Sequence, residues 1–328
     1  MPANLPPEYL EAEQRLRAAR SPAEKISCLE AMLTAMPKHK GTDKLRAALR
    51  RRISKLKAAA QTKKSISKKE SAFRIDKEGA GQVVLVGPPN VGKSALVAAL
   101  TNANPEVADF PHTTWRPTPG MMPVANIQVQ LIDTPPLTKE YVEPELLALI
   151  RRADLIVVVV DLNTDPMQHL EDVIALLREH RIAPRRYQQQ CQEQHRWTFM
   201  PFLVLANKSD DETSVENEEI FRELMDEDWP LVAASAATGR NLELFKQAVV
   251  ERLEIIRVYS KAPGKEADRS APFILKKGST VADFAAKIHK DFLEKLKCAK
   301  IWGTAVFDGQ MVNRDHVLKD EDVVELHV

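Results

Sequence analysis

The stretch that decides the fold is "GQVVLVGPPNVGKSALVAAL", residues 81–100. Its middle, Gly87 to Ser94, has the spacing Gly-x-x-x-x-Gly-Lys-Ser, and it lies between a short β-branched run and an apolar helix-forming segment. A strand, a glycine-rich turn and a helix in this order direct backbone N–H groups and the helix N-terminus at one point, where they bind phosphate. Lys93 then reaches the outer phosphate oxygens, and the Ser94 hydroxyl is a ligand for Mg²⁺.

Four more apolar runs follow and alternate with helix-length segments. They are "IQVQLID" (127–133), "LIVVVVD" (155–161), "FLVLANK" (202–208) and "LVAASA" (231–236). Near-continuous apolar strands separated by helices predict an α/β fold with a doubly wound, mostly parallel sheet of the P-loop NTPase kind. Because ligands of such sheets lie beyond the carboxyl ends of the strands, the residues that end each run are the candidates for chemistry.

The polar ends of the later runs indicate a guanine nucleotide. "NKSD" at 207–210 has the Asn-Lys-x-Asp spacing, which brings the Asp210 carboxylate to the paired N1 and N2 donors of guanine. Adenine does not offer this pair of donors, so Asp210 favours GTP over ATP. Ser235 and Ala236 end the last strand, where the backbone N–H of Ala236 could meet the guanine O6.

Two further positions complete a candidate magnesium site. Asp133 ends the strand 127–133 and is expected to hold the ion through water. Thr113 and Thr114 lie in the proline-rich loop before it, and a loop threonine completes the Mg²⁺ shell of many nucleotide switches when a γ-phosphate is present. The five elements of this candidate nucleotide site occur in order along the chain, each beside a strand. Such an arrangement is not expected by chance.

The N-terminal part reads as helices in "PEYLEAEQRLRAAR" (7–20), "SPAEKISCLEAMLTAM" (21–36) and "GTDKLRAALRRRISKLKAAA" (41–60), with Ser21 as N-cap of the second. In the third, Leu45, Leu49, Ile53 and Leu56 recur at helical spacing and line one face. We therefore predict a basic helical region over residues 1–76.

The region from Lys38 to Lys69 holds thirteen Lys/Arg against one acid, Asp43, although the net charge of the chain is only +1. Such a block suits contact with RNA, above all ribosomal RNA. A solvated helix face followed by a loose linker is the alternative explanation.

After residue 258 the composition changes to the Pro/Gly/charge-rich segment "YSKAPGKEADRSAP". Beyond it we expect a strand in "PFILKK" (272–277), one helix in "STVADFAAKIHKDFLEKL" (279–296) opened by Thr280, and short strands in "AKIWG", "GQMV" and "DVVELHV". One helix among short strands predicts a small β-grasp (ubiquitin-like) domain. The predicted domains are therefore residues 1–76, 77–258 and 259–328, with a hinge at about 259–271.

Together, "GPPNVGKS", "FPHTTWRPTPG", "LIDTPPL", "NKSD" and "SAA" resemble the motifs of the Obg and developmentally regulated (DRG) GTPases of the TRAFAC class. The tail, from "IRVYSK" to "DHVLKDEDVVELHV", resembles the TGS domain that follows the DRG-type core. The resemblance covers roughly residues 80–328. It implies a slow GTPase that works with ribosomes, translation factors or stress signalling.

The resemblance also implies roles for single residues. Thr114 takes the Mg²⁺-contacting role in the first switch, and Asn90 stands at the position that coordinates K⁺ in related GTPases. Lys93, Thr114 and Asp133 are the predicted catalytic residues, and Ser94 and Thr114 the predicted metal ligands. The predicted GTP- and GDP-binding residues are Gly87, Asn90, Val91, Gly92, Lys93, Ser94, Ala95, Asn207, Lys208, Asp210, Ser235 and Ala236.

Three features depart from this family. The chain has no glycine-rich N-terminal domain of the Obg kind and no room for the extra small domain that DRG proteins carry inside the GTPase core. The third is Pro136, which replaces the glycine of the family's Asp-x-Pro-Gly motif, whose N–H bonds the γ-phosphate. Proline has no N–H, so discrimination of GTP from GDP should weaken by roughly 1.5–3 kcal/mol, unless a neighbouring N–H takes over after a small loop shift.

Two functions remain open. Leu137 stands where many GTPases keep a water-orienting glutamine, so a slow GTPase switch is one reading. The other is a nucleotide-gated binding module with negligible hydrolysis.

Composition excludes other classes. The longest apolar run, residues 155–160, is far too short to span a bilayer, and the N-terminus lacks a basic start with an apolar core. Cys28, Cys191 and Cys298 are far apart and show no metal-binding spacing, which suits a reducing compartment. We therefore expect a cytoplasmic protein without membrane contact, and the oligomeric state is not predicted.

Overall fold

The computed structural model describes residues 6–19, 22–37, 42, 46–55, 57, 73–102, 116–138, 142–191, 194–304 and 307–327. The chain divides into two compact units, Met1–Ala72 and Phe73–Val328. None of the helices in the described ranges has the length and apolar character that a membrane span needs.

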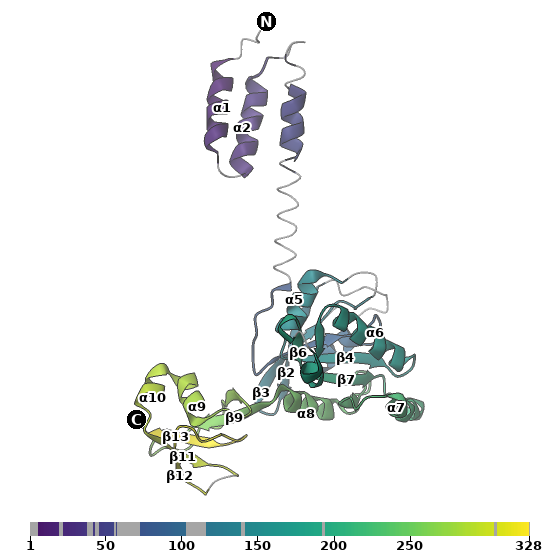
Figure 1. The fold of residues 1–328 in the computed structure, drawn as a ribbon, viewed down its shortest axis with the longest axis vertical. Coiled ribbons are helices and arrows are strands. Elements are labelled where there is room, and N and C mark those ends of the chain that lie inside the picture. The colour runs from purple at the N-terminus through teal and green to yellow at the C-terminus, as the bar shows by residue number, and fades with distance from the viewer. Residues whose placement is uncertain are drawn as a thin grey trace. The chain divides into compact units, whose positions relative to one another are not determined.

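The first unit is helical, as predicted. Helix α1 spans Pro7–Ala18, α2 spans Pro22–Ala35, and residues 46–55 and 57 are helical as well. Figure 1 shows α1 and α2 side by side. Their buried residues form one core with the third segment, made of Tyr9, Ala12, Leu29, Met32, Met36, Leu49 and Ile53. Leu49 and Ile53 thus mark the predicted apolar face, whereas Ser21, Leu45 and Leu56 lie outside the described residues.

The second unit is built on a six-stranded sheet with the order β2-β3-β1-β4-β7-β8. All neighbours pair in parallel except β2 and β3, which are antiparallel. This sheet confirms the predicted mostly parallel α/β fold. Its strands are β1 Gln82–Val86, β2 Thr118–Val124, β3 Ile127–Asp133, β4 Leu155–Asp161, β7 Phe202–Asn207 and β8 Leu231–Ala233.

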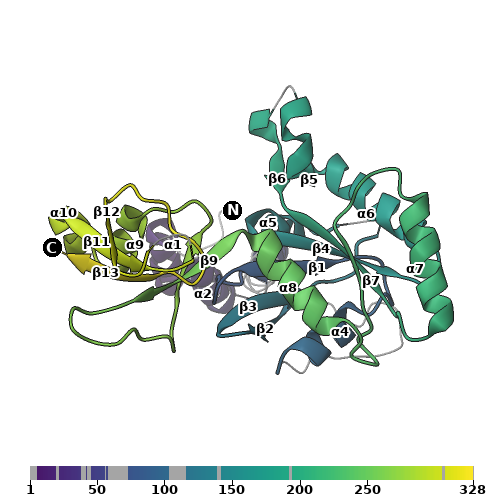
Figure 2. The ribbon, with the colours of Figure 1, turned by 90° about the horizontal axis from the view of Figure 1, so that it is seen from below.

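Helices cover this sheet. Leu96 and Val97 of α4 share one core with Phe245 and Val249 of α8 and with alternate residues of the strands, so these two helices lie on the same face. Figure 2 shows α8 and α4 there and α5 and α6 on the opposite side of β4. The helices are α4 Lys93–Leu100, α5 Pro144–Arg152, α6 Pro166–Glu179, α7 Glu212–Leu224 and α8 Leu242–Leu253.

A small insertion follows α6 that the sequence did not predict. Strands β5 Ile182–Pro184 and β6 Thr198–Met200 pair in parallel, and the short helices Arg185–Gln190 and Gln194–Arg196 lie between them. Figure 2 shows β5 and β6 at the margin of the central sheet, beside α6.

The C-terminal elements form a second sheet, with the order β10-β9-β13-β11-β12. A single core joins this sheet to Val281, Phe284 and Ala285 of the first helix, which confirms the predicted β-grasp domain. Thr280 caps that helix together with Asp283, also as predicted. The elements are β9 Ile255–Ser260, β10 Phe273–Lys276, α9 Val281–Ile288, α10 Lys290–Lys295, β11 Cys298–Trp302, β12 Gln310–Val312 and β13 Val323–His327.

The junction between the two sheets is short. α8 ends at Leu253, Glu254 adopts a left-handed conformation with φ 50°, and β9 begins at Ile255. In the structure, residues 259 and 260 end β9, and residues 261–272 form the loop from β9 to β10. The segment 259–271, predicted as a hinge, therefore lies inside the C-terminal sheet domain, and the connection between the sheets is at Glu254.

Candidate nucleotide-binding site

The loop between β1 and α4 is closed by contacts that only glycine allows. A Cβ on Gly87 would lie 2.4 Å from the carbonyl oxygen of Val159, and one on Gly92 would lie 2.3 Å from Nδ2 of Asn207. Gly92 also has φ 90°, in the left-handed region that glycine favours. Asn90 is exposed and has φ 63°. The loop can therefore turn tightly and aim the N-terminus of α4 at its own concave side.

Lys93 lies across this loop. Its Nζ donates hydrogen bonds to the carbonyl oxygens of Gly87 at 3.1 Å and Pro88 at 2.8 Å. Burial lowers the pKa of Lys93 to about 8, and the charge of Asp133 opposes that shift. Burial makes the charged ammonium group unfavourable in the nucleotide-free protein. A bound phosphate would stabilise the charged form, so Lys93 is suited to bind one.

Ser94 and Asp133 meet where α4 begins and β3 ends. The Ser94 hydroxyl donates to Asp133 Oδ2 at 2.5 Å, and Asp133 is fully buried. Thr134 follows, and its hydroxyl donates to the carbonyl oxygen of Leu85 at 2.6 Å, which ties β3 to β1. A hydroxyl and a carboxylate are the hard oxygen donors that Mg²⁺ prefers, and this ion takes few protein ligands because water and phosphate supply the rest.

The residue after Pro136 already uses its backbone N–H. Leu137 donates this group to the carbonyl oxygen of Gly87 at 3.1 Å, and its side chain is buried. Pro135 and Pro136 are half-buried beside the loop. The segment after β3 is therefore fastened to the phosphate loop through the residue next to the proline.

The "NKSD" segment is joined to the phosphate loop through Asn207. Its Nδ2 donates to the carbonyl oxygen of Val91 at 2.8 Å, and its Oδ1 accepts from the backbone N–H of Ala236 at 3.2 Å. Asn207 is almost completely buried. One side chain thus connects three of the predicted nucleotide-contacting segments.

The remaining residues of the predicted guanine-binding site lie near Asn207. Asp210 is exposed and accepts a short hydrogen bond from the Ser235 hydroxyl, which also accepts from the backbone N–H of Thr238 at 2.9 Å. Lys208 has φ 65°, and its Nζ pairs with Asp161 Oδ2 at 2.6 Å. Ala95, in the first turn of α4, is half-buried.

Sequence reasoning missed two residues that support the site, Thr134 and Asp161. Asp161 ends the buried run "LIVVVVD" as Asp133 ends "IQVQLID", so its position was a usable signal. Thr113 and Thr114 lie outside the described residues, and their predicted role stays a prediction. Within the described ranges there is no group of three or more His, Cys, Asp or Glu side chains able to hold a metal by themselves.

Comparison with known proteins also indicates a GTP-binding domain followed by a small C-terminal domain. Residues 82–199 match the family described as 50S ribosome-binding GTPase, and residues 256–328 match the TGS domain. A GTP-binding protein of Methanocaldococcus jannaschii is 30% identical, with 92% of both chains aligned. Human developmentally-regulated GTP-binding protein 2 and the Ribosome-interacting GTPase 1 of Saccharomyces cerevisiae are each 25% identical over 92% of this chain and 98% of theirs.

A solved structure shares the fold. The Schizosaccharomyces pombe YchF GTPase aligns with 77% of this chain and 99% of its own, with a TM-score of 0.53 at 15% identity.

The parallel sheet, its phosphate loop and its "NKSD" turn define a P-loop GTP-binding protein, and the sheet after it is a TGS domain. Within that class, the chain belongs to the family of DRG-type GTP-binding proteins.

Proposed function

We propose that this DRG-type protein is a slow, Mg²⁺-dependent GTPase that acts as a switch on the ribosome or an RNA-containing partner in the cytoplasm. The observation that supports it most is the meeting of a buried Lys93 with the Ser94–Asp133 pair at one edge of the sheet. A positive charge, a hydroxyl and a carboxylate at the end of a phosphate loop are the parts that phosphoryl transfer uses.

In this proposal the chain's own groups bind and orient the nucleotide. Backbone N–H groups between Gly87 and Ala95 and the Lys93 ammonium hold the β- and γ-phosphates, and Asp210, positioned by Ser235, selects guanine. Ser94 and Thr114 would hold Mg²⁺, with Asp133 behind a water molecule. The ion supplies positive charge to the phosphate oxygens.

Hydrolysis is expected to be slow because, among the described residues that follow β3, no side chain is suited to orient a water molecule. Pro136 has no N–H, and the buried Leu137 presents an aliphatic side chain. K⁺ at Asn90, or a partner protein, would supply the missing charge at the transition state.

The partner is proposed from charge and from relatives. Arg50, Arg51, Arg52 and Lys55 are exposed on the third helical segment, whereas Leu49 and Ile53 face the core. The yeast relative is named a ribosome-interacting GTPase. A basic helix face of this kind, together with the TGS domain, suits contact with ribosomal RNA.

A second candidate is a nucleotide-gated binding module that scarcely hydrolyses GTP. It is favoured by the hydrogen bond from Leu137 N–H to Gly87, because this N–H is already used while Pro136 has none to offer the γ-phosphate.

Steady-state phosphate release, measured with K⁺ and with Na⁺ at equal ionic strength beside GTP and GDP affinities, separates the two. The switch predicts measurable release that K⁺ accelerates, and tighter binding of one nucleotide. Equal affinities for GTP and GDP without phosphate release would exclude the switch and support the binding module. A Ser94→Ala variant controls for contaminating activity, since it removes a proposed Mg²⁺ ligand.

A further inference from the structure

The hairpin formed by β2 and β3 connects the two segments expected to respond to the γ-phosphate. The predicted first switch, which contains Thr114, precedes β2 in the chain, and β3 ends at Asp133, three residues before Pro136. The hairpin is therefore covalently joined to both segments, and its turn at residues 125 and 126 lies at the opposite end from Asp133.

The tip of the hairpin is a two-residue turn, Ala125 and Asn126, between the paired residues Val124 and Ile127. Ala125 has φ 49°, in the left-handed region where alanine carries a cost of about 1 kcal/mol. Two-residue loops are the commonest connections of β-hairpins. The turn places Asn126 at the tip of the hairpin.

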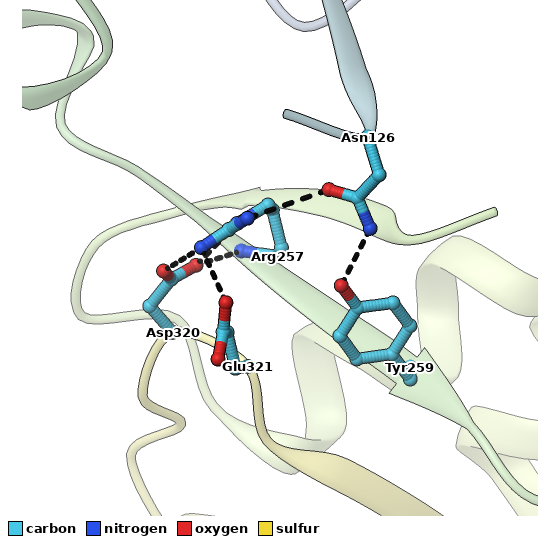
Figure 3. Close-up of polar contacts among 5 residues, drawn as sticks. All are labelled: Asn126, Arg257, Tyr259, Asp320 and Glu321. Carbon is cyan, nitrogen blue, oxygen red and sulfur yellow. Dashed lines mark hydrogen bonds and ion pairs between the residues drawn. The ribbon is translucent and has the colours of Figure 1, made fainter. Parts of the chain in front are cut away.

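Asn126 reaches the first strand of the TGS domain (Figure 3). Its Nδ2 donates to the Tyr259 hydroxyl at 2.6 Å, and its Oδ1 accepts from Arg257 Nη1 at 3.4 Å. A guanidinium group has only donors, so the amide oxygen has to face Arg257 and the amide nitrogen has to face Tyr259. Both partners thus agree on one orientation of the amide.

On the TGS side, further hydrogen bonds hold both partners of Asn126. Asp320 accepts from the backbone N–H of Arg257 at 2.7 Å and from its Nη2 at 2.6 Å, and Glu321 accepts from Nη2 at 2.8 Å. The hydrogen bond from Arg257 to Asp320 raises the pKa of the guanidinium. Tyr259 is buried, and its backbone N–H donates to the carbonyl oxygen of Asp322. Arg257 and Tyr259 therefore meet Asn126 with little freedom of their own.

Beside this contact the two domains are not tightly packed. A groove of about 610 Å³ lies between the hairpin and α8 on one side and the TGS domain on the other, with Val124, Val250 and Leu318 among its lining. Contacts at the junction include the link through Glu254 and the hydrogen bond from Lys276 Nζ to the carbonyl oxygen of Leu253 at 3.4 Å. The polar contact at Asn126 is separate from this junction, so its loss would leave the TGS domain held at the junction and freer to change its orientation.

We propose that Asn126 docks the TGS domain onto the hairpin between the switches, so that the bound nucleotide sets the orientation of the TGS domain through this one side chain. The proposal rests on the proposed GTP switch, and it identifies the contact through which the nucleotide state is transmitted from the site to the TGS domain. The coupling is reciprocal, so weakening the contact changes the relative affinities for GTP and GDP.

The natural cysteines provide the measurement. In a Cys28→Ser background, spin labels on Cys191 in the central domain and Cys298 in the TGS domain, both partly exposed, report one distance between the domains. The full chain is measured with GDP and with a non-hydrolysable GTP analogue. The variants are Asn126→Ala and Tyr259→Phe, which removes only the hydroxyl. Gln128→Ala, an exposed position on the same hairpin, is the matched control.

We expect a narrow distance distribution that differs between the two nucleotides in the parent protein and in Gln128→Ala. In Asn126→Ala and Tyr259→Phe the distribution should broaden, the difference should disappear, and the ratio of GTP to GDP affinity should change about fivefold. Combining both substitutions should add no further change.

The inference is overturned if the parent gives one distribution with both nucleotides, or if Asn126→Ala behaves as the parent does. Failure of the proposed function looks different. A binding titration would then find no uptake of guanine nucleotide, whatever residue stands at position 126.

Discussion

The side-chain amide of Asn207 donates a hydrogen bond of 2.8 Å to the backbone carbonyl of Val91, 116 residues earlier in the chain. The same side chain accepts from Ala236 N–H. The segment expected to read the base thereby supports the loop expected to hold the phosphates. We therefore expect the two ends of a bound nucleotide to be coupled through this buried amide.

Asn207→Ala should weaken GDP and GTP binding equally. It leaves the buried carbonyl oxygen of Val91 and the partly buried N–H of Ala236 without their partner, at a cost of up to about 1–3 kcal/mol each. Urea unfolding should show a free energy of unfolding lowered by at least about 2 kcal/mol, and titration should show higher Kd values for both nucleotides. Asn163→Ala, an exposed asparagine after β4, is the control. Unchanged affinities in Asn207→Ala would refute the link.

Asp210→Asn should change the base preference. The carboxylate is expected to accept from two guanine donors, and losing charge-assisted bonds of this kind costs about 1.5–3 kcal/mol, or roughly a tenfold to hundredfold rise in Kd for GDP. Xanthine nucleotides, which carry a carbonyl where guanine has its amino group, should bind better than before because the new amide can donate. Competition titrations with both nucleotides test this. Ser235→Ala should give a smaller loss, since it only frees Asp210 from its hydroxyl partner.

Nucleotide affinity should fall above about pH 8 because of Lys93. Burial holds its folded pKa at about 8, below its ordinary value of 10.5, so the unfolded chain binds more protons between these values. The contribution of Lys93 to the stability of the nucleotide-free protein therefore increases as the pH rises from about 8 to 10.5. Phosphate favours charged Lys93, so binding takes up a proton, and Kd for GDP should rise by up to about tenfold per pH unit above pH 8.

Titrations between pH 7 and 9 measure that slope. Lys93→Met should bind more weakly and lose the slope, and a slope that persists in this variant would assign the effect to ionisation of the base. The comparison therefore isolates the contribution of the ammonium group.

Pro136→Gly should restore discrimination between GTP and GDP. It supplies the N–H that related GTPases offer to the γ-phosphate, which is worth about 1.5–3 kcal/mol, so GTP should gain about tenfold to hundredfold over GDP. Pro136→Ala should act alike if the N–H is responsible, and Pro135→Gly, one residue earlier, should not. An unchanged ratio in both Pro136 variants would mean that a backbone N–H elsewhere in the site already serves the γ-phosphate.

Removing positive charge from the third helical segment should weaken RNA binding and its salt dependence. Arg51 and Arg52 are both exposed, and replacing both by alanine should lower the slope of log K against log salt by about 1.5 for ribosomal RNA. The matched control replaces Arg15 and Arg17 of α1, which are also exposed and lie beside Glu11 and Glu13. Equal losses in both variants would argue against a specific basic face.

Much of the fold could be predicted because its signals are local. Each parallel strand is a short apolar run with a polar end, and the helix over 281–288 starts with a side-chain cap. Strand β2 could not be predicted in this way. Its sequence "TPGMMPV" has two prolines and a glycine, and it is a strand because it pairs with β3 at the edge of the sheet, where proline is tolerated.

Within the candidate site, residue types were predictable and their partners were not. Motif spacing brought Lys93, Asp133 and Asn207 to attention, whereas the pairing of Lys208 with Asp161 and of Leu137 with Gly87 depends on long-range folding. The helix expected over 279–296 is also interrupted, since His289 has φ −166° between α9 and α10. No periodic pattern marks that break.

Only Glu254 separates α8 from β9, so the number of residues at this point sets the orientation of the TGS domain. One residue more or fewer in α8 would rotate everything after the helix by about 100° about the helix axis, because an α-helix advances by that angle per residue. Arg257 and Tyr259 would then face away from Asn126. In descendants of this chain, insertions and deletions are expected to spare this point and to collect in the loop from residue 261 to 272.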